Sequence, residues 1–132
     1  MQDKFLKEYH GHIFEDWGVS CSDDFRKFAK DFKAYLQKNL PTGAKITKHS
    51  CGHYDLSGFV QYKQCCVYYS WSWNRYSAVN VRGKKLFDGA ALVRYAKNDT
   101  DYTGENNQYC SIEELPEMIS FMFCRRVGKE TA

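Results

Sequence analysis

The sequence predicts an α+β fold in two layers, an antiparallel meander of three to four strands covered on one face by helices. Two observations lead to this prediction. Segments with apolar residues at helical spacing stand at both ends of the chain, and segments that alternate between apolar and polar residues stand between them. The 132 residues suffice for one hydrophobic core, and no linker or repeat divides them, so we expect a single domain over residues 1–132.

Three segments have the spacing of helices. In the first, Phe5, Tyr9, Ile13 and Trp17 lie on one face, although Gly11 weakens the pattern. The second begins at Ser22, carries acidic residues that suit a helix N-terminus, and ends at the Leu-Pro-Thr-Gly sequence 40–43. The third runs from near Leu115 to Arg126 after the capping-box sequence 111–114, with a frayed tail after Gly128. The apolar stripes expected to cover the sheet are Phe25, Phe28, Phe32 and Leu36 in the second helix and Leu115, Met118, Ile119 and Met122 in the third.

Four segments have the pattern of strands. Residues 44–49 form the first, 54–62 and 65–73 form a hairpin around the turn Lys63-Gln64, and 90–96 form the fourth. Residues 74–89 are less regular, with turns at 82–85 and 87–89, and residues 98–108 are expected to be a polar loop. In the hairpin, we expect a subset of Leu56, Val60, Val67, Tyr69 and Trp71 to lie beneath the helices.

The aromatic residues, 17% of the chain, concentrate in this hairpin and predict a binding surface rather than a reaction centre. The helices cover only one face of the sheet, so aromatic side chains on the other face remain available to a partner. No catalytic motif stands out, and we expect neither an enzyme nor a cofactor. The residues predicted to bind a partner are Tyr68, Trp71, Trp73, Arg75, Lys84 and Lys85.

A zinc site is the alternative role for the sequence His49-Ser-Cys51-Gly-His53, since its His and Cys side chains share one face of a strand. Neighbouring residues of one strand face lie too far apart to chelate a metal without a bend, so we assign no metal site. A nucleophilic pair of Cys51 and His53 has no supporting flanking sequence.

Charge is unevenly distributed along the chain. Residues 22–48 are rich in Lys and Arg, whereas residues 98–117 contain six acidic residues and no basic one. Such a molecule can be steered toward a partner of either sign. The alternative function is therefore that of an accessory protein that binds single-stranded nucleic acid through the aromatic sheet. The basic residues expected around that sheet are Lys45, Lys48, Lys63, Arg75, Arg82, Lys84 and Lys85.

Two further features predict a cytoplasmic protein that does not enter membranes. No run approaches the roughly 20 apolar residues that a membrane helix needs. The N-terminal residues 1–10 are charged and lack the apolar centre of a secretion signal. The six cysteines show no CxxC pair, and we expect free thiols.

The segments GHYDLSGF (52–59) and LVRYAKNDTDYTGENNQY (92–109) resemble small accessory proteins of phages, plasmids and conjugative elements. Glu105 departs from the pattern, in which a second glycine is expected. The resemblance implies a non-catalytic, anti-defence protein, such as an anti-CRISPR inhibitor that blocks a host nuclease by protein–protein contact. The implied partner is then a host protein, for instance a CRISPR effector nuclease, and a homodimer through the uncovered sheet face is the alternative.

Overall fold

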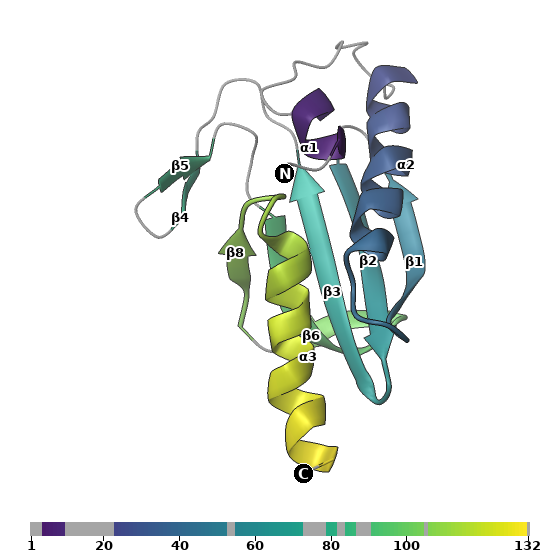
Figure 1. Cartoon of the computed structure of the whole chain (residues 1–132), viewed down its shortest axis with the longest axis vertical. Coiled ribbons are helices and arrows are strands. Elements are labelled where there is room, and N and C mark those ends of the chain that lie inside the picture. Colours follow the sequence, from purple (N-terminus) through teal and green to yellow (C-terminus); the bar gives the residue numbers. More distant parts are fainter. Residues whose placement is uncertain are drawn as a thin grey trace.

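The computed structural model describes residues 4–9, 23–52, 55–72, 79–81, 84–86, 91–104 and 106–131 (Figure 1). For residues 79–81, 84–86, 102–104 and 128–131, only the backbone is described. The helices are α1 (Lys4–Tyr9), α2 (Asp23–Lys38) and α3 (Leu115–Thr131). The strands are β1 (Lys45–Cys51), β2 (Asp55–Tyr62), β3 (Cys65–Ser72), β4 (Val79–Val81), β5 (Lys84–Leu86), β6 (Ala91–Asn98), β7 (Asp101–Gly104) and β8 (Gln108–Cys110).

The main sheet is antiparallel, with the strand order β1-β2-β3-β6-β7, and β8 also pairs with β6. The α+β class is confirmed, but the sheet has more strands than predicted. Residues 98–108, expected to be a loop, contain β7 and the first residue of β8 instead. These short strands pair with the outer edge of β6, whose apolar core-facing residues hold it in the sheet and whose backbone groups need partners.

The segment between β3 and β6 contains a second, two-stranded sheet. β4 and β5 pair antiparallel, with Val81 opposite Lys84. The prediction of a turn over residues 82–85 is therefore wrong for Lys84 and Lys85, which belong to β5. In Figure 1 this hairpin stands apart from the main sheet.

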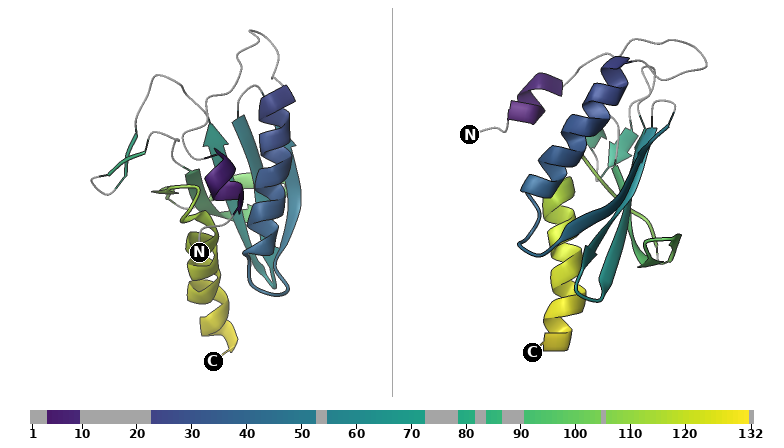
Figure 2. Two further views of the ribbon diagram at one scale, coloured as in Figure 1. Left: turned by 45° about the horizontal axis from the view of Figure 1, so that its top comes forward. Right: turned by 90° about the vertical axis from the view of Figure 1, so that its right-hand side faces the viewer.

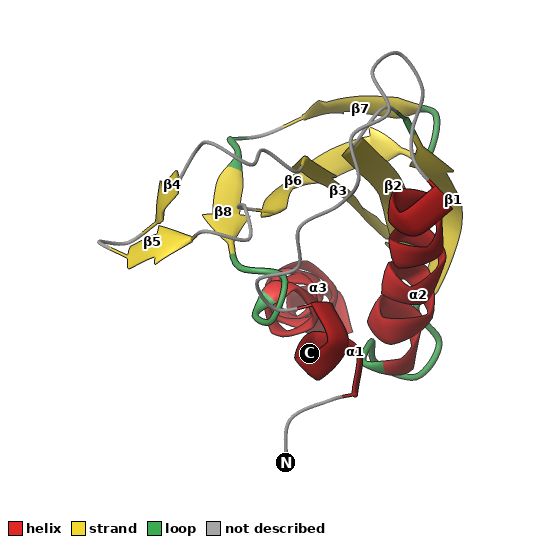
Figure 3. Ribbon diagram, turned by 90° about the horizontal axis from the view of Figure 1, so that it is seen from above, coloured by secondary structure: helices red, strands yellow, loops and turns green. Residues whose placement is uncertain are grey.

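All three helices lie on one side of the sheet (Figure 3). Helix α2 begins with Asp23 and Asp24, whose charges complement the helix dipole. Helix α3 begins after the predicted capping box: Glu114 N–H donates to Ser111 Oγ (3.1 Å), and Ser111 N–H donates to Glu114 Oε1 (3.2 Å). The helix continues to Thr131, beyond the predicted end at Arg126.

The core fills the space between the helices and the sheet, as predicted. Tyr69 lies beneath Phe32 with ring centroids 6.0 Å apart, and Tyr62 contacts Phe123 of α3 at 5.3 Å. Among the residues expected to be buried, only Met118 is partly exposed. The fully buried ones include Phe25, Phe28, Phe32, Leu36, Leu56, Val60, Val67, Tyr69, Leu115, Ile119 and Met122.

Helix α1 covers the first part of the predicted helical pattern; Ile13 and Trp17, at the end of that pattern, lie outside the described residues. It packs against α2 through its aromatic side chains. Phe5 stacks on Tyr35 with ring centroids 4.7 Å apart, and Tyr9 meets Phe28 edge to face at 4.9 Å. Aromatic contacts of this kind add to the stability that burial alone provides.

Candidate functional site

The sheet face turned away from the helices is the candidate site, and we call it the open face. It is defined by strand register, because residues paired across antiparallel strands project to the same side. Residues 48 and 50 of β1, 57 and 59 of β2, 68 and 70 of β3, 92 and 94 of β6 and 109 of β8 are paired in this way. The side chains of the open face therefore include Lys48, Ser50, Ser57, Phe59, Tyr68, Ser70, Leu92, Arg94 and Tyr109, and the same register adds Lys45, Asp55, Gln61, Cys66, Ser72 and Ala96.

One row across the open face places an aromatic pair between two cations. The register runs from Lys48 to Phe59, Tyr68 and Arg94 on four adjacent strands. The rings of Phe59 and Tyr68 are 5.2 Å apart, and the Arg94 guanidinium lies 5.5 Å from the Tyr68 ring centroid. Three strand spacings separate the backbones of Lys48 and Arg94, about 14 Å. The row therefore suits an extended partner better than a small anion.

The next row of the open face is made of small polar and apolar side chains. Ser50, Ser57 and Ser70 follow one another across β1, β2 and β3, and Leu92 and Tyr109 continue the row on β6 and β8. The hydroxyls of Ser50 and Ser57 are 3.4 Å apart. Tyr109 is 45% exposed, so its ring is available at the end of the row. Serine hydroxyls beside tyrosine rings provide adaptable hydrogen bonds next to rigid contact area.

Strand β7 limits the open face on one side. It stands out from the sheet on the side opposite the helices, as two views agree (Figures 2 and 3). Its register with β6 is irregular between Ala96 and Asn98, which is where the chain bends away. The β6–β7 hairpin therefore forms a border on one side of the open face.

Of the six predicted binding residues, the structure describes the side chains of Tyr68 and Trp71. Tyr68 lies on the open face, as its role requires. Trp71 does not: it is only 2% exposed and packs beneath α2, 5.0 Å from the Phe28 ring. Its role as a surface anchor is therefore corrected, because its position in β3 points to the helices. Trp73 and Arg75 lie outside the described residues, and Lys84 and Lys85 belong to β5, where only the backbone is described.

Among the side chains of the open face that were not predicted to bind a partner, three are aromatic or arginine side chains: Phe59, Arg94 and Tyr109. Phe59 stands next to the buried Val60 in β2, and the alternation along this strand could have placed Phe59 on the open face. Arg94 was not among the predicted binding residues, although its strand neighbours Val93 and Tyr95 are buried and leave it on the other face. No strand pattern in the sequence indicated the position of Tyr109, because it directly follows the segment 98–108, which was expected to be a loop.

His49 takes part in a buried contact between the layers. Its Nδ1 atom accepts a hydrogen bond from the Tyr69 hydroxyl (2.6 Å), and its Nε2–H donates to the Ala29 carbonyl (3.1 Å). Burial lowers the pKa of His49, and the nearby charge of Lys33 lowers it further, against the hydrogen bond to Ala29. Both ring nitrogens therefore have protein partners, which argues against a zinc site at His49, Cys51 and His53; His53 lies outside the described residues.

The described residues offer little for metal or thiol chemistry. No cluster of three or more His, Cys, Asp or Glu side chains in that part of the chain is placed to hold a metal ion. Cys66 and Cys124 are free thiols. Burial raises the pKa of Cys66 to about 11, so its thiol stays protonated at neutral pH and is a poor nucleophile.

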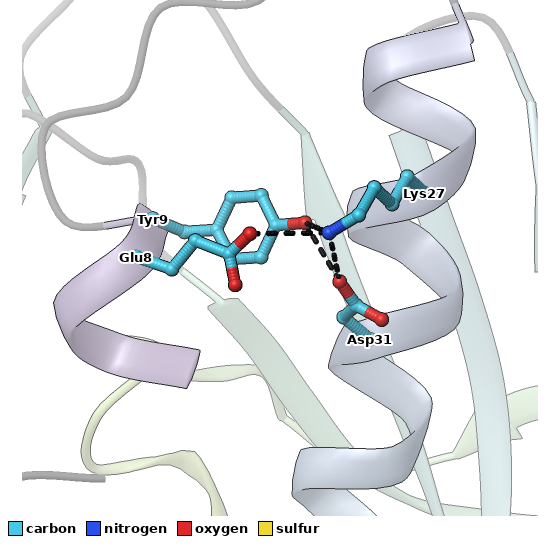
Figure 4. A network of polar contacts seen from close by, with 4 residues as sticks. All are labelled: Glu8, Tyr9, Lys27 and Asp31. Atoms are coloured by element: carbon cyan, nitrogen blue, oxygen red, sulfur yellow. Dashed lines mark hydrogen bonds and ion pairs between the residues drawn. The ribbon is translucent and has the colours of Figure 1, made fainter. Parts of the chain in front are cut away.

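The densest polar cluster joins α1 to α2 (Figure 4). Lys27 Nζ contacts Asp31 (2.9 Å), the Tyr9 hydroxyl (3.0 Å) and Glu8 (3.1 Å), and the Tyr9 hydroxyl donates to Asp31 (2.8 Å). Burial raises the pKa of Tyr9 to about 12, which keeps the phenol protonated. Every group in the cluster has a partner, so we assign it a structural role in fixing α1.

No family model matches the chain, and no curated protein or solved structure matches it either. Within the described residues, none of the helices has the length and apolar character needed to cross a membrane. The candidate site therefore rests on the geometry of the open face alone.

Proposed function

We propose that this protein is a non-catalytic binding protein that acts by occupying the surface of a protein partner with its open face. The observation that carries the proposal is the cross-strand row of Lys48, Phe59, Tyr68 and Arg94. Four paired strands hold this row on a rigid support, so little side-chain order has to be gained on binding.

The composition of the open face supports a protein partner. Tyrosine and arginine are enriched among residues that dominate binding energy at protein interfaces, and serine provides adaptable hydrogen bonds around them. Tyr68 lies at the centre of the face, with Arg94 against its ring and Ser70 next along the strand. An aromatic and arginine centre within a polar border is the usual arrangement of such an interface.

More specifically, we propose that the protein is an anti-defence factor of a phage or mobile element. The partner would then be a host nuclease, such as a CRISPR effector, that is blocked by contact. Support for this form comes from the resemblance of residues 52–59 and 92–109 to accessory proteins of mobile elements. A protein that acts by blocking a surface needs no reaction centre of its own.

The test compares partner capture by three forms of the protein from a lysate of the host. Wild type and the Phe121→Ala variant should retain the same partner, because Phe121 is an exposed aromatic residue on α3, away from the open face. The Tyr68→Ala variant should lose that partner, with affinity lowered at least about 30-fold if Tyr68 is a central anchor. Equal melting temperatures of the two variants would show that both remain folded.

The captured partner is then added with the protein to a nuclease assay. Inhibition by wild type and by Phe121→Ala, but not by Tyr68→Ala, supports the proposed function. Equal capture by Tyr68→Ala would remove the open face as the interface. Recovery of nucleic acid with no protein would instead favour an aromatic platform for single strands.

A further inference from the structure

The two sides of the open face carry opposite charge. Lys45 and Lys48 are exposed on the edge strand β1, and their register with β2 places both on the open face. On the other side, the turn between β6 and β7 contains Asp99, and β7 begins with Asp101. The open face is therefore cationic where β1 forms its edge and acidic where the β6–β7 hairpin forms its border.

The acidic border acts on the open face itself. Burial raises the pKa of Cys66, and the charge of Asp99 raises it further. Cys66 belongs to the open face of β3, two positions before Tyr68. In the strand order, Arg94 of β6 stands next to this border, whereas the two lysines of β1 stand at the opposite edge. The negative potential of the border therefore offsets the charge of Arg94 more than the charges of the lysines.

The two lysines at the β1 edge are open to a carboxylate from outside. Within the part of the chain that the structure describes, neither Lys45 nor Lys48 forms an ion pair. Asp55, an acidic residue that register places on the open face of β2, lies four positions from Phe59. It is therefore about 13 Å along the strand from the row that contains Lys48. A carboxylate of a partner at the β1 edge meets two cations that no described carboxylate contacts.

The aromatic pair beside Lys48 sets where an apolar side chain of the partner can lie. The rings of Phe59 and Tyr68 are 5.2 Å apart and half-buried, so both remain accessible in part. The midpoint between their strands lies one and a half strand spacings from β1, about 7 Å. Side chains two positions apart on an extended segment are also about 7 Å apart and point to the same side. The geometry therefore suits an acidic and an apolar residue two positions apart.

The free edge of β1 is poorly suited to pairing with an added strand. At the start of β1, the Gln37 side chain accepts a hydrogen bond from the Ile46 N–H (3.1 Å) and donates to the Ala44 carbonyl (2.9 Å), as a neighbouring strand would. The register irregularity between Ile46 and Lys48 further disfavours an added strand. A partner segment therefore binds through the side chains of the open face, across the strands, rather than through the backbone of β1.

On the basis of the function proposed for the open face, we propose that this face recognises an extended acidic segment of its protein partner that crosses the strands. Carboxylates of the segment lie at Lys45 and Lys48, and an apolar side chain two positions away lies on Phe59 and Tyr68. Lysine is a point charge on a flexible stem, so it follows a carboxylate without a fixed geometry. The acidic border repels a carboxylate at the other end, so the segment lies with its acidic residues over β1 and not the reverse.

The experiment titrates the isotope-labelled protein at low salt with the peptide Glu-Glu-Thr-Leu-Thr-Ser-Ser and follows the amide signals of β2 and β3 by NMR. Wild type should bind this peptide about tenfold more tightly than a peptide with glutamine in place of glutamate, because the contacts with two lysines are lost. The variant Lys45→Glu/Lys48→Glu should lose the acidic peptide and bind a peptide with lysine in place of glutamate. The control Lys30→Glu/Lys33→Glu changes the net charge by the same amount on the exposed face of α2, on the other side of the sheet, and should bind like wild type.

Three outcomes of the titration would overturn the proposal: equal affinity for the glutamate and glutamine peptides, an equal loss of affinity in both double variants, or no binding at low salt. Tighter binding of a single-stranded oligothymidine than of the acidic peptide would also overturn it and would point to nucleic acid as the partner.

Partner capture from the host lysate separates a failure of this proposal from a failure of the proposed function. If Tyr68→Ala loses the captured protein while Lys45→Glu/Lys48→Glu retains it with unchanged affinity, the open face is the interface but the acidic segment is wrong. If Tyr68→Ala also retains the captured protein, the open-face interface itself is wrong. Loss of the captured protein by both of these variants, but not by Lys30→Glu/Lys33→Glu, supports the acidic segment.

Discussion

Replacement of Gly58 by alanine tests how the sheet and the helix layer are fitted together. Gly58 lies in the middle of β2, directly opposite Tyr69 of β3, on the side that faces the helices. A Cβ atom at this position would collide with the carbonyl oxygen of Lys48 and with the hydroxyl of Tyr69, and would lie 2.7 Å from Tyr69 Cζ. Tyr69 is fully buried, with its ring centroid 6.0 Å from that of Phe32, so a shift of its ring disturbs the packing of the core.

The expected cost follows from two contributions. Overpacking of a well-filled core costs about 1–3 kcal/mol, and a shift of Tyr69 also weakens its hydrogen bond to His49, which is worth about 0.5–1.5 kcal/mol. Together they amount to about 2–4 kcal/mol, or a melting temperature lower by about 10 °C. Urea denaturation followed by circular dichroism measures this difference. The control is Ser57→Ala, which places the same residue one position earlier on the open face and should cost little. A Gly58→Ala protein within about 0.5 kcal/mol of Ser57→Ala would refute the close fit of Tyr69 over β2.

Three further predictions concern the helices and the buried histidine. Phe28→Ala should cost about 3–5 kcal/mol in urea denaturation, because the ring is fully buried against the sheet; an unchanged stability would contradict the packing of α2 on the sheet. Lys27→Ala should cost much less than Phe28→Ala in the same assay, because its contacts are exposed and screened by water and salt, and a comparable loss would contradict this screening. Stability should decrease as pH falls below about 6.5, because the unfolded chain takes up a proton at His49 that the folded protein, with its lowered pKa, does not. The His49→Asn variant should show a weaker pH dependence in denaturation curves between pH 5 and 8, and an unchanged dependence would contradict a buried neutral imidazole.

The elements with a strong periodic pattern could be predicted from the sequence. The apolar stripe of α2 and the alternation of β2 and β3 fixed which residues face the core, because burying one side is the main source of their stability. The turn at Lys63-Gln64 was also correct, although Lys63 adopts a positive φ of 53° without being glycine.

The strands β7 and β8 could not be predicted, because their cause is not local. Residues 98–108 are polar and rich in turn formers, and they become strands by pairing with the outer edge of β6. The open face was missed in part for a related reason. Phe59, Tyr68 and Arg94 are separated in sequence and form one row only once two strand pairings are known.

The segment between β3 and β6, residues 73–90, affects how this protein can evolve. Trp71 and Ala91 are direct partners across these two strands, so the points at which residues 73–90 are joined to β3 and β6 are neighbours in the sheet. The sheet fixes both ends of this excursion, and a doubling of its length costs only about 0.6 kcal/mol in loop entropy. Trp73, Arg75, Lys84 and Lys85 all lie within it. Insertions, deletions and substitutions in this segment can alter what the protein recognises while the main sheet and its helices stay the same. The same segment is suited to the grafting of a foreign peptide.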